Sequence, residues 1–595
     1  MLYINIIYKG SCHAKRYVNH CYHNGFCGLN LLYFLCPLFC NWSPLDKNKE
    51  LYYNKLICFP KGEDAMIEIQ IKLPLRYGDA EIRRAIFHTL PTLQSGELHA
   101  YTLRAITPDT SQKPIASYKA KAILDVDAVR ETGLLKMKKV VRAYHEPVLL
   151  LPEVTKKPSM RPVIVGFGPA GIFCALTLAK AGLRPLVLER GKAVDARAAD
   201  VRRFMEEGLL DPDSNIQFGE GGAGAFSDGK LKYGTLTPEV YTVLCEFVEA
   251  GAPRSILEQK APHIGTDNLP DAVKKLREKI ISFGGEIRFE TTLKDIIFES
   301  GRVSALRIEE GGEEQILACD TLFLATGHSA RELFYMLEEK GVALEARPFG
   351  MGVRIEHKQS AINRQIYGDV EEGILPPATY HLVTHLKNGR SVYNFCMCPG
   401  GTVVMASSLV GGVVTNGMSN YQRDGENANS ALLVSLFPED FEGDRPTRGI
   451  AFQEEIERRA FVLAGGNYRA PAIRLGDFMH GAEPTFSGTV LPTYHGGIAL
   501  TSLDELFPSF ITTSLKEAIL DFDKHQSGFY DEDAILTAPE TRSTSPVRIV
   551  RGENGISTSH GGLYPTGEGA GYSGGILSSA TDGIKQAILY LNTLK

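Results

Sequence analysis

Apolar and polar residues alternate over residues 66–73, and this period of two predicts a half-buried β-strand. A helix is predicted near 79–91 with Asp79 as its N-cap, and strands are predicted near 98–106, 116–125 and 136–143. The last of these carries four basic side chains, a pattern typical of a solvated edge strand and also of a small patch for an anionic partner: Lys136, Lys138, Lys139 and Arg142. Residues 66–152 are therefore predicted to form a small α+β domain.

An uncharged run at 162–179 separates Arg161 from Lys180. Its length would suit a membrane helix, but three glycines and Pro169 within it predict a buried strand, a tight turn and a buried helix instead. Farther along, helices at 238–250 and 270–284 precede strands at 286–291 and 321–325, and a last helix is predicted at about 574–592. This alternation favours an α/β architecture.

Composition narrows the function classes. The chain has 595 residues, of which 44% are hydrophobic and 23% charged, and its net charge is −6. These values exclude a wholly disordered chain and a multi-span membrane protein, and no strong field draws the chain to nucleic acid. Only five of the eleven cysteines lie after residue 65. A large body with few thiols is typical of the reduced cytoplasm, where we place the protein.

Residues 1–65 differ from the rest of the chain. The run at 12–27 contains six residues of zinc-ligand type whose spacing matches no paired-cysteine pattern, so no metal site is predicted: Cys12, His13, His20, Cys21, His23 and Cys27. The apolar run at 29–40 is too short to span a membrane. We predict a non-conforming, disordered extension, with the working protein beginning at Met66.

A glycine motif carries the chemistry. Residues 163–171 read as a strand, a turn with Gly166 and Gly168, and a helix start at Gly171. This arrangement lets backbone N–H groups reach a pyrophosphate. The next strand ends in Glu189, where a carboxylate should meet ribose hydroxyls and disfavour a 2′-phosphate.

Three later segments decide between NAD and FAD. The glycine loop at 219–230 is predicted to lie against an extended cofactor. The sequence Ala325-Thr326-Gly327 resembles the strand-end signature of two-dinucleotide-fold flavoproteins. Residues 567–576 resemble their C-terminal element, in which an acid binds the ribityl hydroxyls and a helix N-terminus faces the flavin. The order of these segments favours FAD. The predicted cofactor-binding residues are Gly166, Gly168, Pro169, Ala170, Gly171, Glu189, Arg190, Gly222, Gly224, Asp228, Gly229, Lys230, Gly327, Gly567, Glu568, Gly574, Gly575 and Ile576.

Five long stretches resemble one family: residues 218–231, 395–401, 465–471, 540–548 and 567–576. The chain over 66–595 is similar to the FAD-dependent dehydrogenases, or NAD(P)/FAD-dependent oxidoreductases, that carry a dedicated FAD-dependent C-terminal domain. The resemblance implies an FAD-binding oxidoreductase fold. It supplies no settled substrate.

Four side chains are candidates for catalysis. Cys396 and Cys398 could form a redox pair, although Cys-x-Cys is narrower than the usual spacing, and they could equally be packing residues. His263 could be a general acid or base or a hydrogen-bonded turn residue. Arg542 could hold an anionic substrate or the flavin pyrimidine or lie on a polar strand face. His381 and His385, four residues apart, are interpreted as surface residues on a helix, and no metal site is predicted in the body.

Together these features predict an α/β, Rossmann-like, two-dinucleotide-fold flavoprotein with an inserted substrate or cap domain. The predicted domains are the extension at 1–65, the α+β domain at 66–152, the FAD-binding domain at 160–335 and 541–595, and the substrate domain at 336–540. The expected activity is hydride transfer through flavin N5 to or from a small organic substrate, with NAD(P)H as a candidate transient reductant. The alternatives are a flavin monooxygenase and an FAD-containing RNA-binding or RNA-modifying protein. We expect a small-molecule partner rather than a membrane or nucleic acid, and the oligomeric state is left open.

Overall fold

The computed structural model describes residues 65–595. The predictions for the extension, including its zinc-ligand types and its apolar run, lie outside this range. Within it, no helix combines the length and the apolar character needed to cross a bilayer. The described residues divide into a small N-terminal module, a parallel-sheet region and a large antiparallel region.

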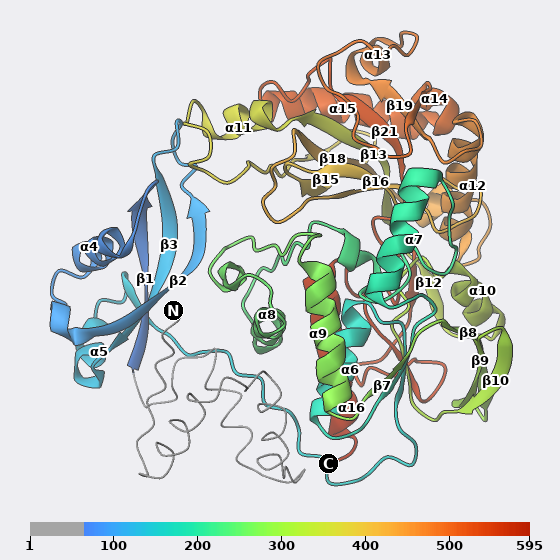
Figure 1. The fold of residues 1–595 in the computed structure, drawn as a ribbon, viewed down its shortest axis with the longest axis horizontal. Helices are drawn as coiled ribbons and strands as arrows, with labels where there is room; N and C mark the ends of the chain where they lie inside the picture. Colours follow the sequence, from blue (N-terminus) through green and yellow to red (C-terminus); the bar gives the residue numbers. More distant parts are fainter. Residues whose placement is uncertain (1–64) are drawn as a thin grey trace, which may run out of the picture. The chain divides into compact units, whose positions relative to one another are not determined.

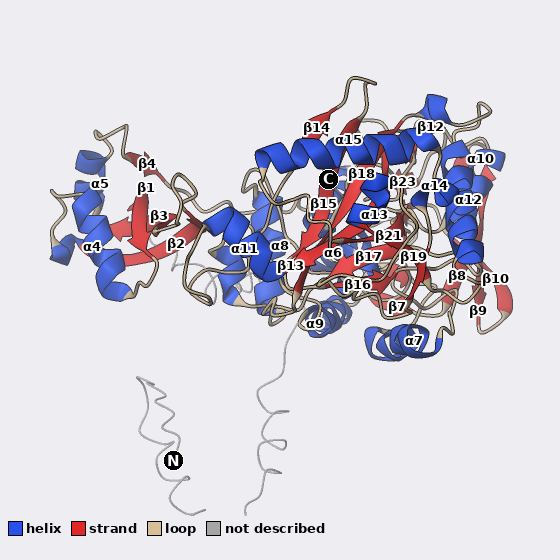
Figure 2. Cartoon of the chain, turned by 90° about the horizontal axis from the view of Figure 1, so that it is seen from above, coloured by secondary structure: helices blue, strands red, loops and turns tan. Residues whose placement is uncertain are grey.

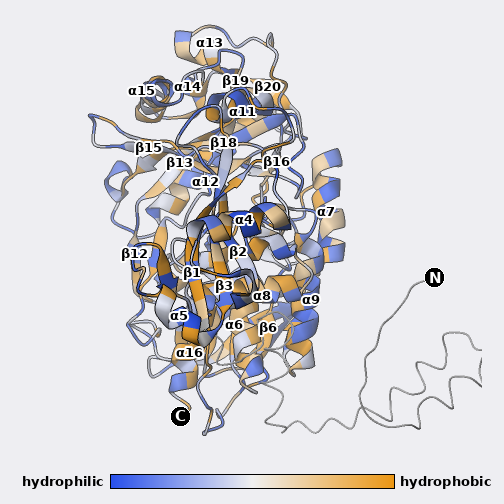
Figure 3. Ribbon diagram, turned by 90° about the vertical axis from the view of Figure 1, so that its left-hand side faces the viewer, coloured by the Kyte–Doolittle hydropathy of each residue, from blue (hydrophilic) through white to orange (hydrophobic). Residues whose placement is uncertain are grey.

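The N-terminal module is an antiparallel four-stranded sheet covered by helices. Its elements are β1 (Ala65–Pro74), α4 (Asp79–Thr89), β2 (Leu98–Pro108), β3 (Ser117–Val126), α5 (Ala128–Leu134) and β4 (Val141–Ala143), with a 3₁₀ turn, η2 (Ser95–Glu97). The strand order is β2-β3-β1-β4. Alternate residues of β1 are buried, among them Ile67, Ile69 and Ile71, because one face of the sheet packs on the helices. Figure 3 shows these hydrophobic residues along β1 and hydrophilic ones on α4.

The prediction of a basic strand over 136–143 is largely wrong. The strand is only β4, and Lys136, Lys138 and Lys139 lie before it, in the turns that follow α5. The short helix α5 was not predicted from the sequence. It takes up residues 128–134, and the chain then needs the turns at 135–140 before a strand can begin. The three lysines and Arg142 are exposed, and Arg142 lies on the edge strand β4.

A five-stranded parallel sheet, in the order β23-β11-β5-β6-β7, forms the second region. Its strands are β5 (Val163–Val165), β6 (Leu186–Leu188), β7 (Glu286–Arg288), β11 (Leu322–Leu324) and β23 (Leu563–Pro565). One face carries α6 (Pro169–Lys180), which packs against α9 (Leu269–Ser282) and α16 (Ile576–Asn592). Figure 1 shows these three helices side by side. The fold class is therefore confirmed as α/β and Rossmann-like.

The other face of the parallel sheet packs on an antiparallel three-stranded meander, made of β8 (Thr291–Glu299), β9 (Arg302–Glu310) and β10 (Glu313–Ala318). One core joins Val163 and Leu186 of the sheet with Leu293 and Leu306 of the meander. The helices α7 (Val194–Glu207), α8 (Pro238–Glu249) and α10 (Arg331–Glu339), the 3₁₀ turns η3 (Gly222–Phe226) and η4 (Arg254–Leu257), and the pair β12 (Leu344–Ala346) and β22 (Val547–Ile549) complete this region.

The third region lies between β12 and β22 in the sequence. Its seven-stranded sheet has the order β14-β15-β18-β13-β21-β19-β20. The strands are β13 (Phe349–Lys358), β14 (Val383–His385), β15 (Ser391–Cys398), β18 (Asn427–Leu436), β19 (Ala470–Arg474), β20 (Ile498–Leu500) and β21 (Ile535–Glu540), and a separate pair is β16 (Thr402–Met405) and β17 (Thr415–Met418). Figure 2 shows these strands in red with the blue helices around them.

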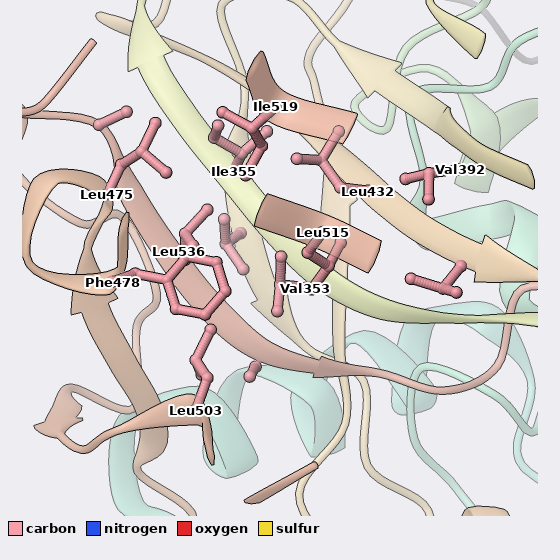
Figure 4. Packing of buried hydrophobic residues seen from close by; sticks show 14 of the residues in the cluster. Val353, Ile355, Val392, Leu432, Leu475, Phe478, Leu503, Leu515, Ile519 and Leu536 are labelled. Carbon is pink, nitrogen blue, oxygen red and sulfur yellow. The ribbon is translucent and has the colours of Figure 1, made fainter. Parts of the chain in front are cut away.

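Helices cover this sheet and bury its apolar residues. They are α11 (Gln359–Tyr367), α12 (Arg448–Leu463), α13 (Leu475–His480), α14 (Leu503–Leu506) and α15 (Ser509–His525), with a 3₁₀ turn, η5 (Pro438–Asp440). Figure 4 shows Leu515 and Ile519 of α15 packed over Val353 and Leu432 of the sheet. Fully burying such a side chain contributes about 1.5–3 kcal/mol. The core therefore holds β13, β15 and β21 in fixed positions, and β15 and β21 carry side chains into the cavity described next.

Candidate active site

A cavity of about 710 Å³ lies between the parallel-sheet region and the seven-stranded sheet. This volume is typical of small-molecule and cofactor sites. The parallel-sheet region contributes the β5–α6 turn, the loop at 217–232, the segment after β11 and the start of α16. The seven-stranded sheet contributes residues from the approach to β15, from β15 itself and from the end of β21.

The β5–α6 turn brings three backbone segments very close together. Gly166 has φ of 100°, and a Cβ atom there would lie 2.4 Å from the carbonyl oxygen of Ala325. A Cβ at Gly171 would lie 2.0 Å from the carbonyl oxygen of Gly166, so only glycine lets α6 start this close to the strand. Gly168 precedes the helix, and no described side chain caps it. The free N–H groups at the start of α6 consequently face the cavity, where an anion would satisfy them.

Glu189, at the end of β6, is a buried acid on the cavity wall. Its Oε2 accepts a hydrogen bond of 2.8 Å from the Phe167 N–H, and its Oε1 accepts bonds of 3.0 Å from the N–H groups of Gly191 and Gly219. These three donors hold the carboxylate in one orientation beside the glycine turn. A carboxylate fixed there could accept hydrogen bonds from ribose hydroxyls.

A second helix start faces the same cavity. α16 follows Gly574 and Gly575, which line the cavity together with Ile576, and no described side chain caps it. A Cβ at Gly583 of α16 would lie 2.1 Å from the carbonyl oxygen of Ala170, so the two helices pack backbone to backbone. The cavity thus receives the positive ends of two helix dipoles, which favour a diphosphate and negative charge on a reduced flavin.

The structure brings most of the predicted cofactor residues to the cavity wall. All of them line it except Gly171 and Gly567. These two glycines lie behind the wall, where a Cβ atom would be 2.0 Å from the Gly166 carbonyl oxygen and 2.6 Å from the Ala170 Cβ, respectively. Asp228 and Lys230 sit together, with 2.7 Å between the Lys230 Nζ and an Asp228 oxygen. The backbone cradle, the two helix starts and the fixed acid therefore fit FAD, whose pyrophosphate would lie at the glycine turn and whose ribose would meet Glu189.

The predicted catalytic residues divide into two pairs. Cys396 and Arg542 line the cavity, whereas Cys398 and His263 lie behind its wall. The ring of His263 stacks on Tyr421, and its Nε2 lies 2.9 Å from the Tyr421 carbonyl oxygen. Burial, with a contribution from Arg423, lowers the pKa of His263, so the imidazole is neutral near pH 7. His263 is thus hydrogen-bonded, as in the alternative that the sequence offered, but it lies in a β-bridge with Lys230 and not in a turn.

Arg542 belongs to a buried ion triad. Its Nε and Nη2 donate to the two oxygens of Glu457 at 3.0 and 2.8 Å, and Arg331 donates to the same oxygens at 2.7 and 2.9 Å. Burial opposes the ionised form of Glu457, but the charges of Arg331 and Arg542 outweigh it and lower its pKa to about 2. The Arg542 guanidinium is therefore directed at Glu457 rather than at a substrate.

Two residues at the site were not singled out from the sequence: His328 on the cavity wall and Arg354 behind it. His328 directly follows Gly327, and its Nε2 is buried without a hydrogen-bond partner among the described residues. Arg354 of β13 is fully buried and donates to both oxygens of Glu540 at 3.1 and 3.0 Å. His328 could have been identified from the sequence, because it directly follows the Ala-Thr-Gly signature. No local motif marks Arg354.

His381 is a surface residue, as interpreted from the sequence, and it also lines the cavity. It is exposed and precedes β14, whose last residue is His385. The two histidines therefore lie on extended chain and not on a helix. Within the described residues, no group of three or more His, Cys, Asp or Glu side chains is placed to hold a metal ion.

Glu568 and His328 form a pair on the cavity wall, with 3.6 Å between Glu568 Oε1 and His328 Nδ1. Burial, with the nearby Cys396, raises the pKa of Glu568 to about 7. Burial and the charges of Arg542 and Arg331 lower the pKa of His328 to about 4. At pH 7 the pair is a neutral imidazole beside a carboxyl that is half protonated.

This pair predicts a pH dependence of stability. A carboxyl whose folded pKa is about 7, against an ordinary 4.5, favours the folded state most below pH 4.5 and loses that contribution as the pH rises to about 7. Since 26% of the side chain is exposed, we expect a loss of about 2 kcal/mol relative to Glu568→Gln. Urea unfolding of both proteins without added FAD from pH 4.5 to 8 measures it. A difference that stays constant with pH would contradict the assignment.

Comparison with known proteins gives two family matches. Residues 160–368 match the pyridine nucleotide-disulphide oxidoreductase family, and residues 348–543 match the family described as FAD-dependent protein, C-terminal domain-like. A relative from Clostridium beijerinckii, described as an uncharacterized protein, is 48% identical over 435 residues, which cover 73% of this chain and 81% of the relative.

Two solved structures are also similar over much of the chain. One is a geranylgeranyl bacteriochlorophyll reductase-like protein from Thermoplasma acidophilum, with 13% identity, a TM-score of 0.31 and coverage of 71% of this chain and 76% of that chain. The other is a 3-ketosteroid-Δ4-(5α)-dehydrogenase from Rhodococcus jostii, with 12% identity, a TM-score of 0.30 and coverage of 75% and 99%.

Proposed function

This chain belongs to the family of FAD-dependent oxidoreductases that carry the FAD-dependent C-terminal domain, and from that premise we propose that it transfers hydride between flavin N5 and a small organic substrate. When bound, FAD supplies a two-electron centre that accepts or gives hydride. The single observation that carries the proposal is the cavity in which the glycine turn, the start of α16 and Glu189 converge.

The residues on one side of the cavity bind the cofactor, and those on the other side contact the substrate. On the parallel-sheet side, the starts of α6 and α16 bind negative charge and Glu189 orients the ribose. On the other side, β15 and β21 offer Asn394 and Glu540 to a substrate, with Tyr380 nearby. The apolar core behind these strands excludes water from the wall of the site.

The cavity has polar side chains where a substrate would bind. Five basic side chains line it, namely Arg190, Lys230, Lys232, Arg423 and Arg542, and four acids line it, namely Glu189, Asp228, Glu540 and Glu568. This small surplus of positive charge supports a substrate with an anionic group. NAD(P)H, which carries phosphates, is one candidate reductant that would meet the same charges.

Anaerobic absorbance spectroscopy of the full chain tests this proposal. We expect a flavin spectrum from the purified protein that bleaches on reduction by NADH, by NADPH or by an organic substrate. Bleaching by one nucleotide would identify a reductase, and bleaching by neither would direct the search to the substrate as donor. A folded protein that retains no FAD after reconstitution would overturn the proposal.

A further inference from the structure

Two thiols lie in contact at the cavity wall. Cys396 and Cys398 are both free, Cys396 lines the cavity and Cys398 is fully buried behind it. The Cys398 thiol donates a hydrogen bond to the Cys396 carbonyl oxygen at 3.2 Å, and the two side chains interact. Both residues belong to β15, outside the residues 160–368 that match the disulphide oxidoreductase family. The pair is therefore a feature of the seven-stranded sheet.

The backbone at this pair is distorted. Cys396 has φ of 47°, in the left-handed region that residues other than glycine seldom adopt. The pairing register between β15 and β18 shifts between Phe395 and Cys398. Such strain costs on the order of 1–3 kcal/mol and is concentrated at functional sites. Here the strained residue is itself one of the two cysteines.

Positive charge surrounds the sulfurs. The Lys230 Nζ lies 3.4 Å from the Cys398 Sγ, and the Arg354 Nη1 donates to the Cys396 carbonyl oxygen at 3.0 Å. Arg423 joins the cluster through Asp228, to which it donates with Nε at 3.1 Å and with Nη2. Three cations thus face two carboxylates, Asp228 and Glu540, and one positive charge is left over.

A thiolate balances this charge. The hydrogen bond from Cys398, with the charges of Lys230 and Arg354, lowers the pKa of the Cys396 thiol well below its ordinary value. The other acid that faces Cys396 is Glu568, which is half neutral at pH 7 because burial raises its pKa to about 7. Tyr380 also faces the pair, and burial keeps its hydroxyl protonated. Thiolate, not thiol, is the nucleophilic form.

We propose that Cys396 and Cys398 form a redox-active pair that reduces low-molecular-weight disulfides by thiol–disulfide exchange. The Cys396 thiolate attacks one sulfur of the substrate, the substrate S–S bond breaks, and the first thiolate leaves. Cys398 then attacks the Cys396 sulfur of the mixed disulfide, its proton passes to a leaving thiolate, and the second thiol is released.

The products are a Cys396–Cys398 disulfide, one substrate thiol and one substrate thiolate that takes a proton from the solvent, so the chain loses the two electrons that the substrate gains. Residues two apart on a regular strand have Cα atoms about 6.7 Å apart, at the upper end of the range that a disulfide spans, and the left-handed backbone at Cys396 breaks this regular spacing. A thiol in excess reverses the exchange and restores the pair. Because the step uses no electrons from a cofactor, the proposal goes beyond the FAD-dependent activity and does not depend on it.

Peptide mapping of the full chain with FAD bound tests the exchange. The protein is reduced with a phosphine, desalted without oxygen, exposed to bis(2-hydroxyethyl) disulfide, quenched in acid and alkylated with N-ethylmaleimide. Mapping is needed because the chain has eleven cysteines. We expect the Cys396–Cys398 peptide to lose two hydrogens and to resist alkylation.

Variants assign the two roles. Cys398→Ser should trap a mixed disulfide at Cys396, Cys396→Ser should leave Cys398 alkylated, and Cys245→Ser, a control on α8, should behave as the wild type. Full alkylation of both cysteines in the wild type, or oxidation of Cys398 without Cys396, would overturn the proposal. The FAD content is measured on the same samples. Exchange in a protein that holds no FAD would contradict the proposed function and support this one.

The charge argument has its own test in the reaction of Cys396 with iodoacetamide at pH 7, followed on the same peptide. Lys230→Met removes the ammonium group next to the sulfurs, and we expect about tenfold slower alkylation. Lys232→Met is the matched control, because this exposed lysine lines the same cavity without a described contact to either sulfur. Equal rates in the two variants would contradict the stabilised thiolate.

Discussion

Gly168→Ala is expected to fold as the wild type does and to lose most of its affinity for FAD. A Cβ atom at Gly168 would meet nothing closer than the Gly222 Cα at 3.6 Å, which is ordinary van der Waals contact, so the protein itself accommodates the methyl group. The same methyl group would occupy the space through which a pyrophosphate reaches the start of α6. Overpacking of this kind costs about 1–3 kcal/mol, which weakens FAD binding about ten- to a hundredfold.

The measurement is titration of the apoprotein with FAD, followed by flavin fluorescence, with thermal unfolding as the check on folding. Gly133→Ala is the control, because a Cβ there would meet no atom within 4 Å and the residue lies in α5, in the N-terminal module. Unchanged FAD affinity in Gly168→Ala would contradict the placement of the pyrophosphate at this turn. Loss of folding in the same variant would instead contradict the space that the structure shows around Gly168.

Glu457→Gln is expected to destabilise the protein by about 3–5 kcal/mol. Glu457 is fully buried and is the acceptor for both Arg331 and Arg542, so the amide would leave Arg542 without its carboxylate and Arg331 with only Glu454, 3.7 Å away. The triad joins α10, α12 and the segment after β21, and its loss would loosen the contact between the parallel-sheet region and the seven-stranded sheet. Urea unfolding at pH 7 measures the change.

The control for this variant is Glu455→Gln, on the same helix. Glu455 pairs with Arg459 on the surface, where both side chains are largely exposed, so its removal should cost no more than about 1 kcal/mol. If the two variants lost equal stability, the buried triad would have no special role. Each variant removes one carboxylate from the same helix. The difference between their free energies of unfolding therefore measures how much more the buried pairing contributes than the exposed one.

The parts of the fold that the sequence predicted are those with a local cause. The alternation at 66–73 appears as β1, because one face of that strand is buried. The glycine turn at Gly166 also appears, since its backbone conformation depends on neighbouring residues. The prediction of a basic strand at 136–143 was wrong, because the conformation of this segment depends on the helix that precedes it and not on its own pattern of residues. The helix that ends at Leu134 is followed by turns, in which the three lysines lie. A pattern of lysines alone does not distinguish a turn from an edge strand.

The candidate site divides in the same way. Glu189 and Glu568 follow motifs of fixed spacing, so both could be named before the structure was known. Lys230 and Cys398, by contrast, are 168 positions apart and meet only because two sheets face each other. The left-handed backbone at Cys396 has no signature in the sequence either. Contacts of this kind depend on tertiary packing, which single-sequence patterns do not contain.

The parallel sheet is completed by β23, and one wall of the cavity by α16, both from the last 33 residues of the chain. During synthesis, β5 and β11 therefore leave the ribosome long before their last partner strand. The intervening seven-stranded sheet has its own core and can fold in the interval. The cofactor site is incomplete until β23 and α16 have been made, so a transcript truncated before Leu563 should yield a colourless protein in which the seven-stranded sheet is folded.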